Sequence, residues 1–330
     1  MPLCISVEKT HADLALRELR KRGLLDSRYS VTRANGHVVI PVLASSTGDL
    51  ELPFAKFKVY ECYPPARRKV EVDVPSLDLV GNVVILRENV LKYRRLEDVV
   101  SSIKQVYPRV KAIWVKEETV EEFRTPSLKL LWGEEIRDVS VKEYGIVMRV
   151  KLGEVYFNPR LAEEHRRVAQ LVRDSEVVVD AFSGIGGFSL HIASLRRALI
   201  LANDLNPRAY ELLLENIELN LRRLKGAIIP LNNNVAELPD VLRGHCADRV
   251  IADLPVKSLE YVEVYEEMLK PGGILHLYTL FAQDVKQLRE RLSEAFVGWF
   301  IQKCVTVLEY APRMSIYRCD LVKSQGVKMH

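Results

Sequence analysis

The chain of 330 residues is 48% hydrophobic and carries a formal net charge of +4, which suggests two or three globular domains with substantial cores. No apolar run approaches the roughly 20 residues needed to span a bilayer, and the first residues lack the features of a signal peptide, so we expect a soluble protein of the cytoplasm. The small net charge does not demonstrate nucleic-acid binding, but it is compatible with a local basic surface that contacts phosphates.

The first region, residues 1–66, is predicted to be a small α/β module. A helix is expected to end at Gly23, because glycine is favoured just after a helix. The pair Asn35-Gly36 predicts a tight turn between two strands. Arg20 belongs to a basic run on the helix, which forms either a solvated face or a phosphate contact. The elements are strands at 3–7, 29–33 and 37–42 and a helix at 10–22.

A linker at residues 63–69 is expected after this module, because its paired prolines resist both a helix and a central strand. The second region, residues 67–155, is predicted to be an α+β domain. In it, Lys92, Tyr93 and Arg95 belong to a run that mixes basic and aromatic side chains. Such a run suits stacking and pairing with RNA, and a solvated helix entry explains it equally well. The elements are strands at 83–86, 112–115, 128–131 and 146–150 and a helix at 96–107.

The third region, residues 156–330, alternates strands with helices, which predicts a doubly wound sheet. Asn206 and Pro207 are typical of the cap and the first turn of a helix. A Pro-Gly-Gly run at 271–273 predicts a tight turn before the fifth strand, and the last two strands are expected to pair antiparallel. The strands are expected at 177–182, 198–202, 227–231, 249–252, 274–278, 304–310 and 316–322, and the helices near 188, 206, 258–269 and 283–295.

A glycine-rich turn follows the first strand of this region. Gly184 and Gly186 let the backbone approach a ligand, and the following helix N-terminus favours a nucleotide. Ser189 stands where a dinucleotide fingerprint has its third glycine, and Asp180 would repel a pyrophosphate but welcome a cationic amine. S-adenosylmethionine therefore suits the turn better than NAD or FAD. Seven strands, mostly parallel with a final hairpin, are the pattern of a Rossmann-like class I methyltransferase domain.

Polar residues follow the next three strands as well. Asp204 comes 24 positions after Asp180, where a carboxylate can accept bonds from ribose hydroxyls, although capping of the next helix is an alternative. Asn234 is placed to bond adenine, and turn chemistry explains it about as well. Asp253 and Pro255 follow the fourth strand, where the methyl-accepting group is expected. The residues expected to bind S-adenosylmethionine are Asp180, Phe182, Gly184, Gly186, Asp204, Leu205, Asn234 and Asp253.

Several stretches together resemble the archaeal and eukaryal tRNA methyltransferases that modify N1 of guanosine 37, beside the anticodon. These stretches are residues 123–125, 155–164, 180–189, 204–207, 253–255 and 310–313. The resemblance covers essentially the whole chain and implies two smaller N-terminal α+β domains before the methyltransferase domain. It further implies that residues 1–66 touch the outer corner of tRNA, that residues 67–155 bind RNA, and that residues 156–330 bind S-adenosylmethionine.

The resemblance also implies the catalytic residues. N1 of guanine carries a proton at neutral pH, so its methylation requires a base and a cation or donor for the charge on O6. By position, Glu164 matches the family's general base and Arg124 its O6 stabiliser, while Asp253 and Pro255 shape the acceptor end. The target base must be turned out of its stack to reach them. Contacts with RNA are expected from Arg20, Lys92, Arg95 and Arg160.

The chain departs from the family at three positions. Gly187 stands where a proline is usual, Asn234 where an Asp is usual, and Asp253 where an Asn is usual. Asp253 keeps an acceptor for guanine N–H groups but loses a donor and adds charge, which leaves the substrate atom or the rate open. Two alternatives therefore remain. One is a wyosine-pathway enzyme that methylates C7 of the tricyclic precursor or transfers an aminocarboxypropyl group, and the other is a catalytically idle tRNA-binding paralogue.

The cysteines and histidines indicate no metal site and no disulfide framework. His191 and His276 fall in apolar stretches, as core residues do. The cysteines are scattered and never spaced as Cys-x-x-Cys, so we predict reduced, buried thiols. We expect no bound metal and a monomer. The cysteines are Cys4, Cys62, Cys246, Cys304 and Cys319.

Overall fold

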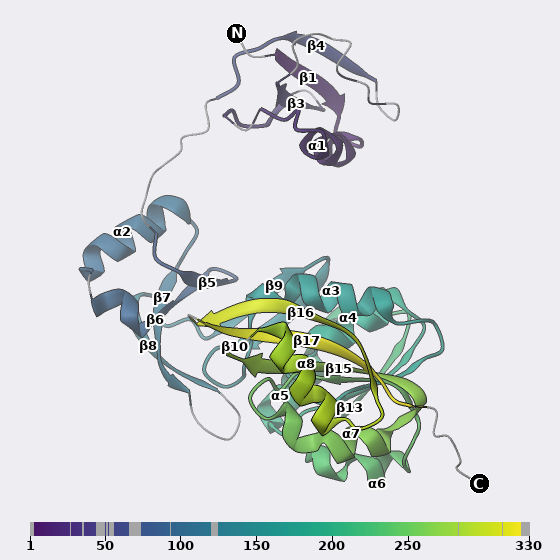
Figure 1. Ribbon diagram of the computed structural model, residues 1–330. Helices are drawn as coiled ribbons and strands as arrows, with labels where there is room; N and C mark the ends of the chain where they lie inside the picture. The colour runs from purple at the N-terminus through teal and green to yellow at the C-terminus, as the bar shows by residue number, and fades with distance from the viewer. Residues whose placement is uncertain are drawn as a thin grey trace. The chain divides into compact units, whose positions relative to one another are not determined.

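The computed structural model describes residues 3–26, 28–34, 36–43, 50, 52, 56–65, 74–92, 94–119, 125–282, 284–311 and 313–324. The chain divides into two compact units, Met1–Val72 and Asp73–His330, and each is considered by itself (Figure 1). Within the described ranges, no helix combines the length and the apolar character required to cross a bilayer. The division into three domains at residues 66 and 155 stays a prediction.

The N-terminal unit is a four-stranded sheet, in the order β2-β3-β1-β4, with one helix packed against it. Ile5, Leu19 and Ile40 have no exposed surface and form its core. Gly23 has a φ of 68° just after the helix, as predicted. The predicted turn at Asn35 lies outside the described residues. The elements are β1 (Leu3–Glu8), α1 (Ala12–Lys21), β2 (Thr32–Ala34), β3 (His37–Val42) and β4 (Phe57–Glu61).

The second unit begins with another four-stranded sheet, in the order β5-β6-β7-β8. Its helix, α2, connects β6 to β7, which pair in parallel, and it buries Ile103 against Leu86 and Ile113. The predicted strands and helix are confirmed here, while β5 was not predicted. The elements are β5 (Leu77–Val80), β6 (Val83–Arg87), the 3₁₀ helix η2 (Glu88–Lys92), α2 (Leu96–Val106), β7 (Ala112–Thr119) and β8 (Pro126–Gly133).

The remainder of the unit is built on a seven-stranded sheet, in the order β13-β12-β11-β14-β15-β17-β16. Every neighbouring pair is parallel except those that involve β17, so the predicted, mostly parallel class I sheet is confirmed. The strands are β11 (Val177–Asp180), β12 (Leu199–Asn203), β13 (Ala227–Leu231), β14 (Ala247–Ala252), β15 (Leu269–Phe281), β16 (Phe300–Ala311) and β17 (Met314–Val322).

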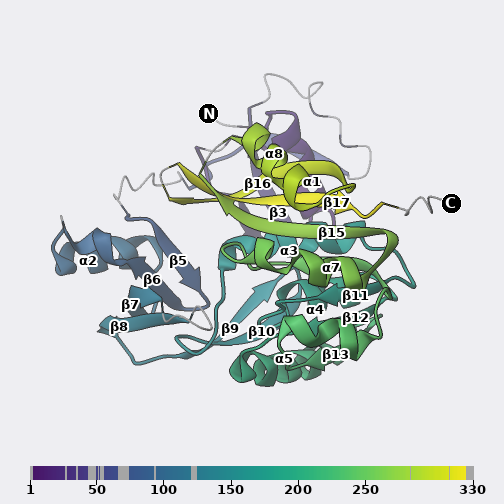
Figure 2. The same cartoon turned by 60° about the horizontal axis from the view of Figure 1, so that its bottom comes forward.

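Helices cover both faces of this sheet (Figure 2). Successive residues of β11 show the division: Val178 packs with Ile192 of α4, and Val179 packs with Leu292 of α8. The helices are α3 (Ala162–Leu171), α4 (Gly187–Leu195), α5 (Pro207–Asn220), α6 (Leu238–Leu242), α7 (Val262–Met268) and α8 (Val285–Ala295), with short 3₁₀ helices η3 (Pro159–Leu161), η4 (Leu221–Arg223), η5 (Val235–Glu237) and η6 (Ser258–Tyr261).

The Pro-Gly-Gly run at 271–273 lies inside β15 rather than before it, which corrects the predicted turn. Leu269 already pairs with Ala247 of β14, so the strand begins earlier than expected. Gly272, with a φ of 77°, bends the strand while its N–H donates to Lys323 O at 3.0 Å. The strand therefore continues through the bend because its neighbours on both sides supply hydrogen-bond partners.

A hairpin that follows the four-stranded sheet in the sequence packs on the domain with the seven-stranded sheet (Figure 1). Its strands are β9 (Asp138–Glu143) and β10 (Ile146–Lys151). Asn216 of α5 holds the backbone of Arg149, accepting from its N–H at 2.7 Å and donating to its carbonyl at 3.2 Å. Asn220 holds Val147 in the same way, at 3.1 and 2.7 Å. Side-chain amides of α5 thus replace a neighbouring strand.

Two disulfides overturn the prediction of reduced thiols, and they involve all the cysteines except Cys246. Cys304 and Cys319 are directly opposite each other in the antiparallel pair of β16 and β17. Cys4 of β1 bonds Cys62, which follows the neighbouring strand β4 and lies 58 positions away. Strand pairing brings the cysteines of each disulfide together, and their spacing along the chain does not predict this.

Candidate active site

A cavity of about 470 Å³ lies at the carboxyl ends of β11, β12, β13 and β14. Ligands of doubly wound sheets bind at this edge, because the loops that leave parallel strands converge there. Six of the eight residues predicted to bind the donor line the cavity. They are Phe182, Gly184, Asp204, Leu205, Asn234 and Asp253.

Two glycines of the turn have different roles. Gly184, with a φ of 53°, lines the cavity and donates its N–H to Asp204 Oδ2 at 2.7 Å. Gly186 is not among the lining residues. A Cβ on Gly186 would lie 2.6 Å from Leu213 Cδ1, so this glycine lets α4 approach α5 closely. The turn therefore combines ligand approach with helix packing.

Asp204 is held by the backbone on both of its oxygens. Oδ2 accepts from Gly184, and Oδ1 accepts from Asn206 N at 2.9 Å. Burial raises the pKa of Asp204, and the two backbone N–H groups act against that rise. Asn206 caps α5, as predicted, by accepting from Arg208 N at 3.0 Å. The carboxylate at the cavity wall is thereby fixed in position.

Asn203 braces the same wall, and the sequence analysis did not identify it. Its side chain is 1% exposed and donates to Ala181 O at 3.3 Å and to Asn233 O at 3.1 Å. It also accepts from Asn233 N at 3.0 Å. Asn203 therefore ties together the loops after β11 and β13, and the loop after β13 carries Asn234 to the cavity. A polar residue at the end of a strand of otherwise apolar residues was the available signal.

Asp180 lies beneath the cavity and is absent from its lining. Its carboxyl has no exposed surface; Oδ2 accepts from Ser189 Oγ at 2.6 Å, and Oδ1 has no partner in the part of the chain that the structure describes. Burial raises the pKa of Asp180 to about 7 against the hydrogen bond from Ser189, and the charge of Asp253 contributes to the rise. A cation bound above it would favour its ionised form.

The loop after β14 forms the opposite wall. Asp253 and Lys257 line the cavity, whereas Pro255 is buried behind it and accepts from Leu280 N at 2.8 Å. Phe182 and Tyr261, whose ring centroids are 5.8 Å apart, supply aromatic surface. Lys257 was not predicted, since a lysine after an Asp-Leu-Pro turn resembles any solvated side chain.

Glu164 lies in a buried polar network rather than in the cavity lining. Oε1 accepts from Tyr278 Oη at 2.8 Å and from Arg318 Nη1 at 2.7 Å. Oε2 accepts from two nitrogens of Arg167, the nearer at 2.6 Å. Burial would raise the pKa of Glu164, but the charge of Arg318 and the hydrogen bonds of Arg167 and Tyr278 lower it overall. The next residue, His165, does line the cavity.

Gly187 accommodates the ring of His165. A Cβ on Gly187 would lie 2.6 Å from His165 Cε1 and 2.7 Å from Nε2. The imidazole thus occupies space that any larger residue at position 187 would need. This packing accounts for the glycine at a position where the resembling family usually has a proline.

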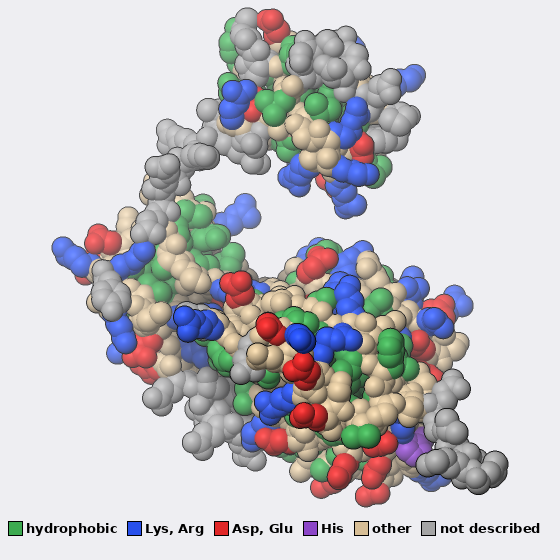
Figure 3. All heavy atoms as spheres, in the orientation of Figure 1, with side chains coloured by type: hydrophobic (Ala, Val, Ile, Leu, Met, Phe, Trp, Pro, Cys, Tyr) green, Lys and Arg blue, Asp and Glu red, His purple; other side chains and the backbone are tan. Residues whose placement is uncertain are grey.

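The residues predicted to contact RNA lie in several places, and Arg124 lies outside the described residues. Arg160 of η3 donates to Asp78 Oδ1 of β5 at 2.7 Å, so it joins η3 to the four-stranded sheet of the second unit. Lys92 and Arg95 are exposed, and Arg95 lies 3.7 Å from Glu97. Arg20 is exposed on α1, where Figure 3 shows Lys and Arg side chains gathered.

Comparison with known proteins gives matches over nearly the whole chain. The TRM5/TYW2 methyltransferase domain matches residues 139–297, and the tRNA methyltransferase 5 N-terminal domain matches residues 4–51. A Pyrococcus abyssi protein named tRNA (guanine(37)-N(1))-methyltransferase Trm5b is 30% identical, with 95% of this chain and 96% of that protein covered. A Saccharolobus solfataricus protein named tRNA 4-demethylwyosine(37)-methyltransferase Taw21 is 34% identical, with 62% of this chain and 77% of that protein covered.

Solved structures agree with these matches. A complex of aTrm5 and tRNALeu is 27% identical, with a TM-score of 0.65 and coverage of 98% of this chain and 100% of that chain. Trm5 of Methanocaldococcus jannaschii in complex with adenosine is 25% identical, with a TM-score of 0.62 and coverage of 99% of this chain and 100% of that chain. The chain belongs to the tRNA (guanine(37)-N(1))-methyltransferase family, whose methyltransferase domain depends on S-adenosylmethionine.

Proposed function

We propose that the protein acts as a monomer and transfers a methyl group from S-adenosylmethionine to N1 of guanosine 37 in tRNA. The observation that carries this proposal is the convergence of six predicted donor-binding residues on one cavity at the carboxyl edge of the sheet. That cavity lies in a chain that matches a relative named for this reaction over 95% of its length. Its volume, about 470 Å³, is within the usual range for a cofactor site.

The cavity suits the proposed donor in its chemistry. S-adenosylmethionine, when bound, supplies a methyl group on a cationic sulfur. Asp204 offers its remaining lone pairs to ribose hydroxyls, and Phe182 and Leu205 offer apolar surface to adenine. Asn234 lines the same wall, where it would bond the adenine edge. Asp180 places a carboxylate beneath the glycine turn, where it favours a cation.

Glu164 is our candidate for the general base, and Arg167 is the group that would have to move. In the described state Glu164 accepts from three residues, and its lowered pKa makes it a weak base. The side chain of Arg167 is 35% exposed, whereas those of Arg318 and Tyr278 are buried. We propose that RNA phosphates draw Arg167 away, which frees Oε2 and raises the pKa of the carboxyl. Tyr278 and Arg318 then keep Oε1 in place.

The acceptor end is assigned to Asp253 and Arg124. Asp253 lines the cavity and offers oxygens to the N–H groups of guanine, and Pro255 shapes the loop behind it. Arg124, by its match to the family, would stabilise the charge that develops on O6, an effect typically worth roughly 3 to 4 kcal/mol. These roles remain proposals for this chain.

Contacts with tRNA are assigned to both units. The exposed side chains of Arg20, Lys92 and Arg95 would meet phosphates, and Arg160 would brace the domain that holds the anticodon stem-loop. Removal of residues 1–72 should weaken binding of full-length tRNA while sparing an isolated anticodon stem-loop, because that unit is proposed to touch the outer corner of tRNA. Equal losses for the two RNAs would argue against that contact.

Labelled methyl transfer tests the reaction. The protein is incubated with labelled S-adenosylmethionine and with two tRNA transcripts that differ only in having G or A at position 37. Label in the G transcript alone is the expected result. Equal labelling of both transcripts would show that the acceptor lies elsewhere in the tRNA.

A second candidate is methylation of C7 in a wyosine precursor at position 37. The 34% identity to the relative named for that reaction, over 62% of this chain, favours keeping it. The match to the guanosine enzyme extends over the N-terminal unit as well, which ranks N1 methylation first. Assays on tRNA that carries 4-demethylwyosine, in parallel with unmodified tRNA, separate the two reactions.

A further inference from the structure

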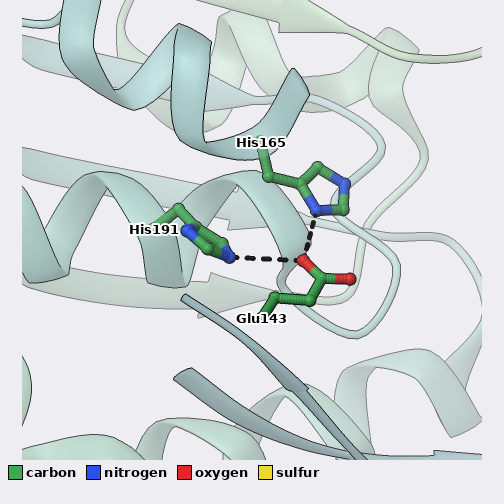
Figure 4. A group of neighbouring side chains, drawn as sticks. All are labelled: Glu143, His165 and His191. Carbon is green, nitrogen blue, oxygen red and sulfur yellow. Dashed lines mark hydrogen bonds and ion pairs between the residues drawn. The ribbon is translucent and has the colours of Figure 1, made fainter. Parts of the chain in front are cut away.

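Three buried side chains from three separate elements meet beside the donor cavity (Figure 4). They are Glu143 at the end of β9, His165 in α3 and His191 in α4, with exposures of 7%, 5% and 1%. His165 Nδ1 lies 2.9 Å from Glu143 Oε2, and His191 Nε2 lies 3.2 Å from the same oxygen. One ligand atom from each residue lies within 4.8 Å of the other two.

The trio leaves one buried atom without a partner. Both imidazoles approach Oε2 of Glu143, whereas Oε1 has no hydrogen-bond partner among the described residues. That oxygen is buried, and a buried carboxylate oxygen without a hydrogen-bond donor is costly. A cation bound to the Glu143 carboxylate would offset that cost.

Two of the three ligand–ligand distances suit a first-row divalent metal, and the two imidazole nitrogens that form the third pair lie within 4.8 Å of each other. Ligands bound to zinc at about 2.0 to 2.2 Å in tetrahedral geometry lie roughly 3.3 Å from one another. The two nitrogen–oxygen distances, 2.9 and 3.2 Å, are close to that spacing. Two imidazoles and one carboxylate form a donor set that zinc accepts readily. We propose that Glu143, His165 and His191 bind one zinc ion.

The surroundings of the trio allow a metal to enter and to complete its coordination. A second cavity of about 470 Å³ is lined by Glu143 and its neighbour Tyr144, so we place the entry of the metal, and of a water as fourth ligand, on the Glu143 side of the trio. On binding, His165 Nδ1 and His191 Nε2 present lone pairs to the metal and carry their protons on the other ring nitrogens. The hydrogen-bonded trio is the metal-free form of the same site.

The consequence of zinc binding is structural. The ligands come from the β9–β10 hairpin and from two helices of the methyltransferase domain, so the metal would join all three. His165 also packs on Gly187 in the wall of the donor cavity. A metal on its other side would hold that ring in place. Zinc should therefore stabilise the fold without contacting the proposed reaction centre.

Zinc titration of the full-length protein tests the proposal. After treatment with a chelator, the protein is titrated with Zn²⁺ in the presence of a competing indicator, and its thermal midpoint is followed. We expect one tightly bound zinc per chain and a higher midpoint. Cobalt(II) in place of zinc should give visible absorption bands of a low-coordinate nitrogen and oxygen site. Neither readout depends on methyl transfer.

Substitutions test which residues bind the zinc ion. Glu143→Gln and His191→Asn should each weaken zinc binding by about 100-fold or more. His37→Asn, at an exposed histidine on β3, should bind as the wild type does. Failure of the wild-type protein to bind zinc at micromolar free concentration would overturn the proposal, whether or not the variants fold. Stoichiometric binding that survives both ligand substitutions would overturn it as well.

Discussion

Arg318 of β17 donates a 2.7 Å hydrogen bond to Glu164 of α3, across 154 positions of the chain. Both side chains are nearly excluded from solvent, at 2% and 6% exposure. Arg318 also bonds Asp320, whose Oδ1 in turn lies 2.5 Å from His276 Nδ1. Glu164, the proposed base, thus belongs to a continuous buried polar network with Arg318, Asp320 and His276. The residues that fix the position of Glu164 are far from it in the sequence, and no local sequence pattern indicates these contacts.

The substitution Glu164→Gln should reduce methyl transfer by about 10² to 10⁴ while leaving donor affinity unchanged, since it removes the base and Glu164 does not line the donor cavity. Single-turnover rates and equilibrium donor binding measure the two effects separately. Glu163→Gln is the matched control, because Glu163 is the exposed neighbour and bonds Tyr144 instead. Full turnover by Glu164→Gln would remove Glu164 from the base role.

The substitution Arg318→Met should lower the free energy of unfolding by about 3 to 5 kcal/mol near pH 7, because it leaves buried carboxylates short of a partner. The folded-state pKa values of Glu164 and Asp320 are lowered, so their contribution is present above their unfolded pKa and is lost as pH falls through the folded one. The loss of stability caused by Arg318→Met should therefore become smaller at acidic pH. Denaturant unfolding at several pH values checks this, and a deficit that does not change with pH would contradict it.

The substitution Asp180→Asn should abolish a pH dependence of donor binding. With a pKa of about 7, Asp180 is mostly protonated below neutral pH, so affinity for the cationic donor should rise as pH increases toward 7 and then level off. The effect of rising pH on folding stability through Asp180 has the opposite sign. Because the folded pKa exceeds the unfolded one, this group makes folding less favourable as pH rises from about 4 to 7.

Titration calorimetry with S-adenosylmethionine from pH 5.5 to 8 measures the effect of Asp180. S-adenosylhomocysteine is the matched ligand, because it keeps the cationic amine but lacks the positive sulfur. If Asp180 favours the amine, both ligands should show the same dependence on pH. Equal pH profiles for the wild type and Asp180→Asn would mean that another group controls donor binding.

The substitution Gly187→Ala should destabilise the fold by about 1 to 3 kcal/mol, because the added methyl overlaps the His165 ring. In a His165→Ala background the same change should cost much less, since the ring is gone. A double-mutant cycle on unfolding free energies measures this coupling. Additive changes in the free energy of unfolding would show that the His165 ring moves aside and that its contact with the added methyl does not destabilise the fold.

Local signals sufficed for much of the fold. The β-branched run at β11, the Asn206 cap of α5 and the final antiparallel pair were predicted correctly because each depends on adjacent residues. The donor cavity was also predictable in outline, since carboxyl ends of parallel strands share one edge. Asp204 and Asp253 follow two such strands and both reach the cavity.

The contacts that the sequence could not indicate join residues far apart along the chain. No residue near Glu164 in the sequence indicates its partners, because β15 and β17 bring Tyr278 and Arg318 to it. Glu143 and His191 are 48 positions apart, with no metal-binding spacing between them. Such contacts depend on sheet order and register, which local patterns of residues do not specify.

Nucleoside mass spectrometry of the methylated tRNA tests the central claim most directly. Unmodified tRNA with G at position 37 is reacted with S-adenosylmethionine, digested to nucleosides and compared with standards for each methylguanosine isomer. The account predicts 1-methylguanosine, derived from position 37, as the product. A different methylguanosine, or 1-methylguanosine from another position in the tRNA, would contradict it.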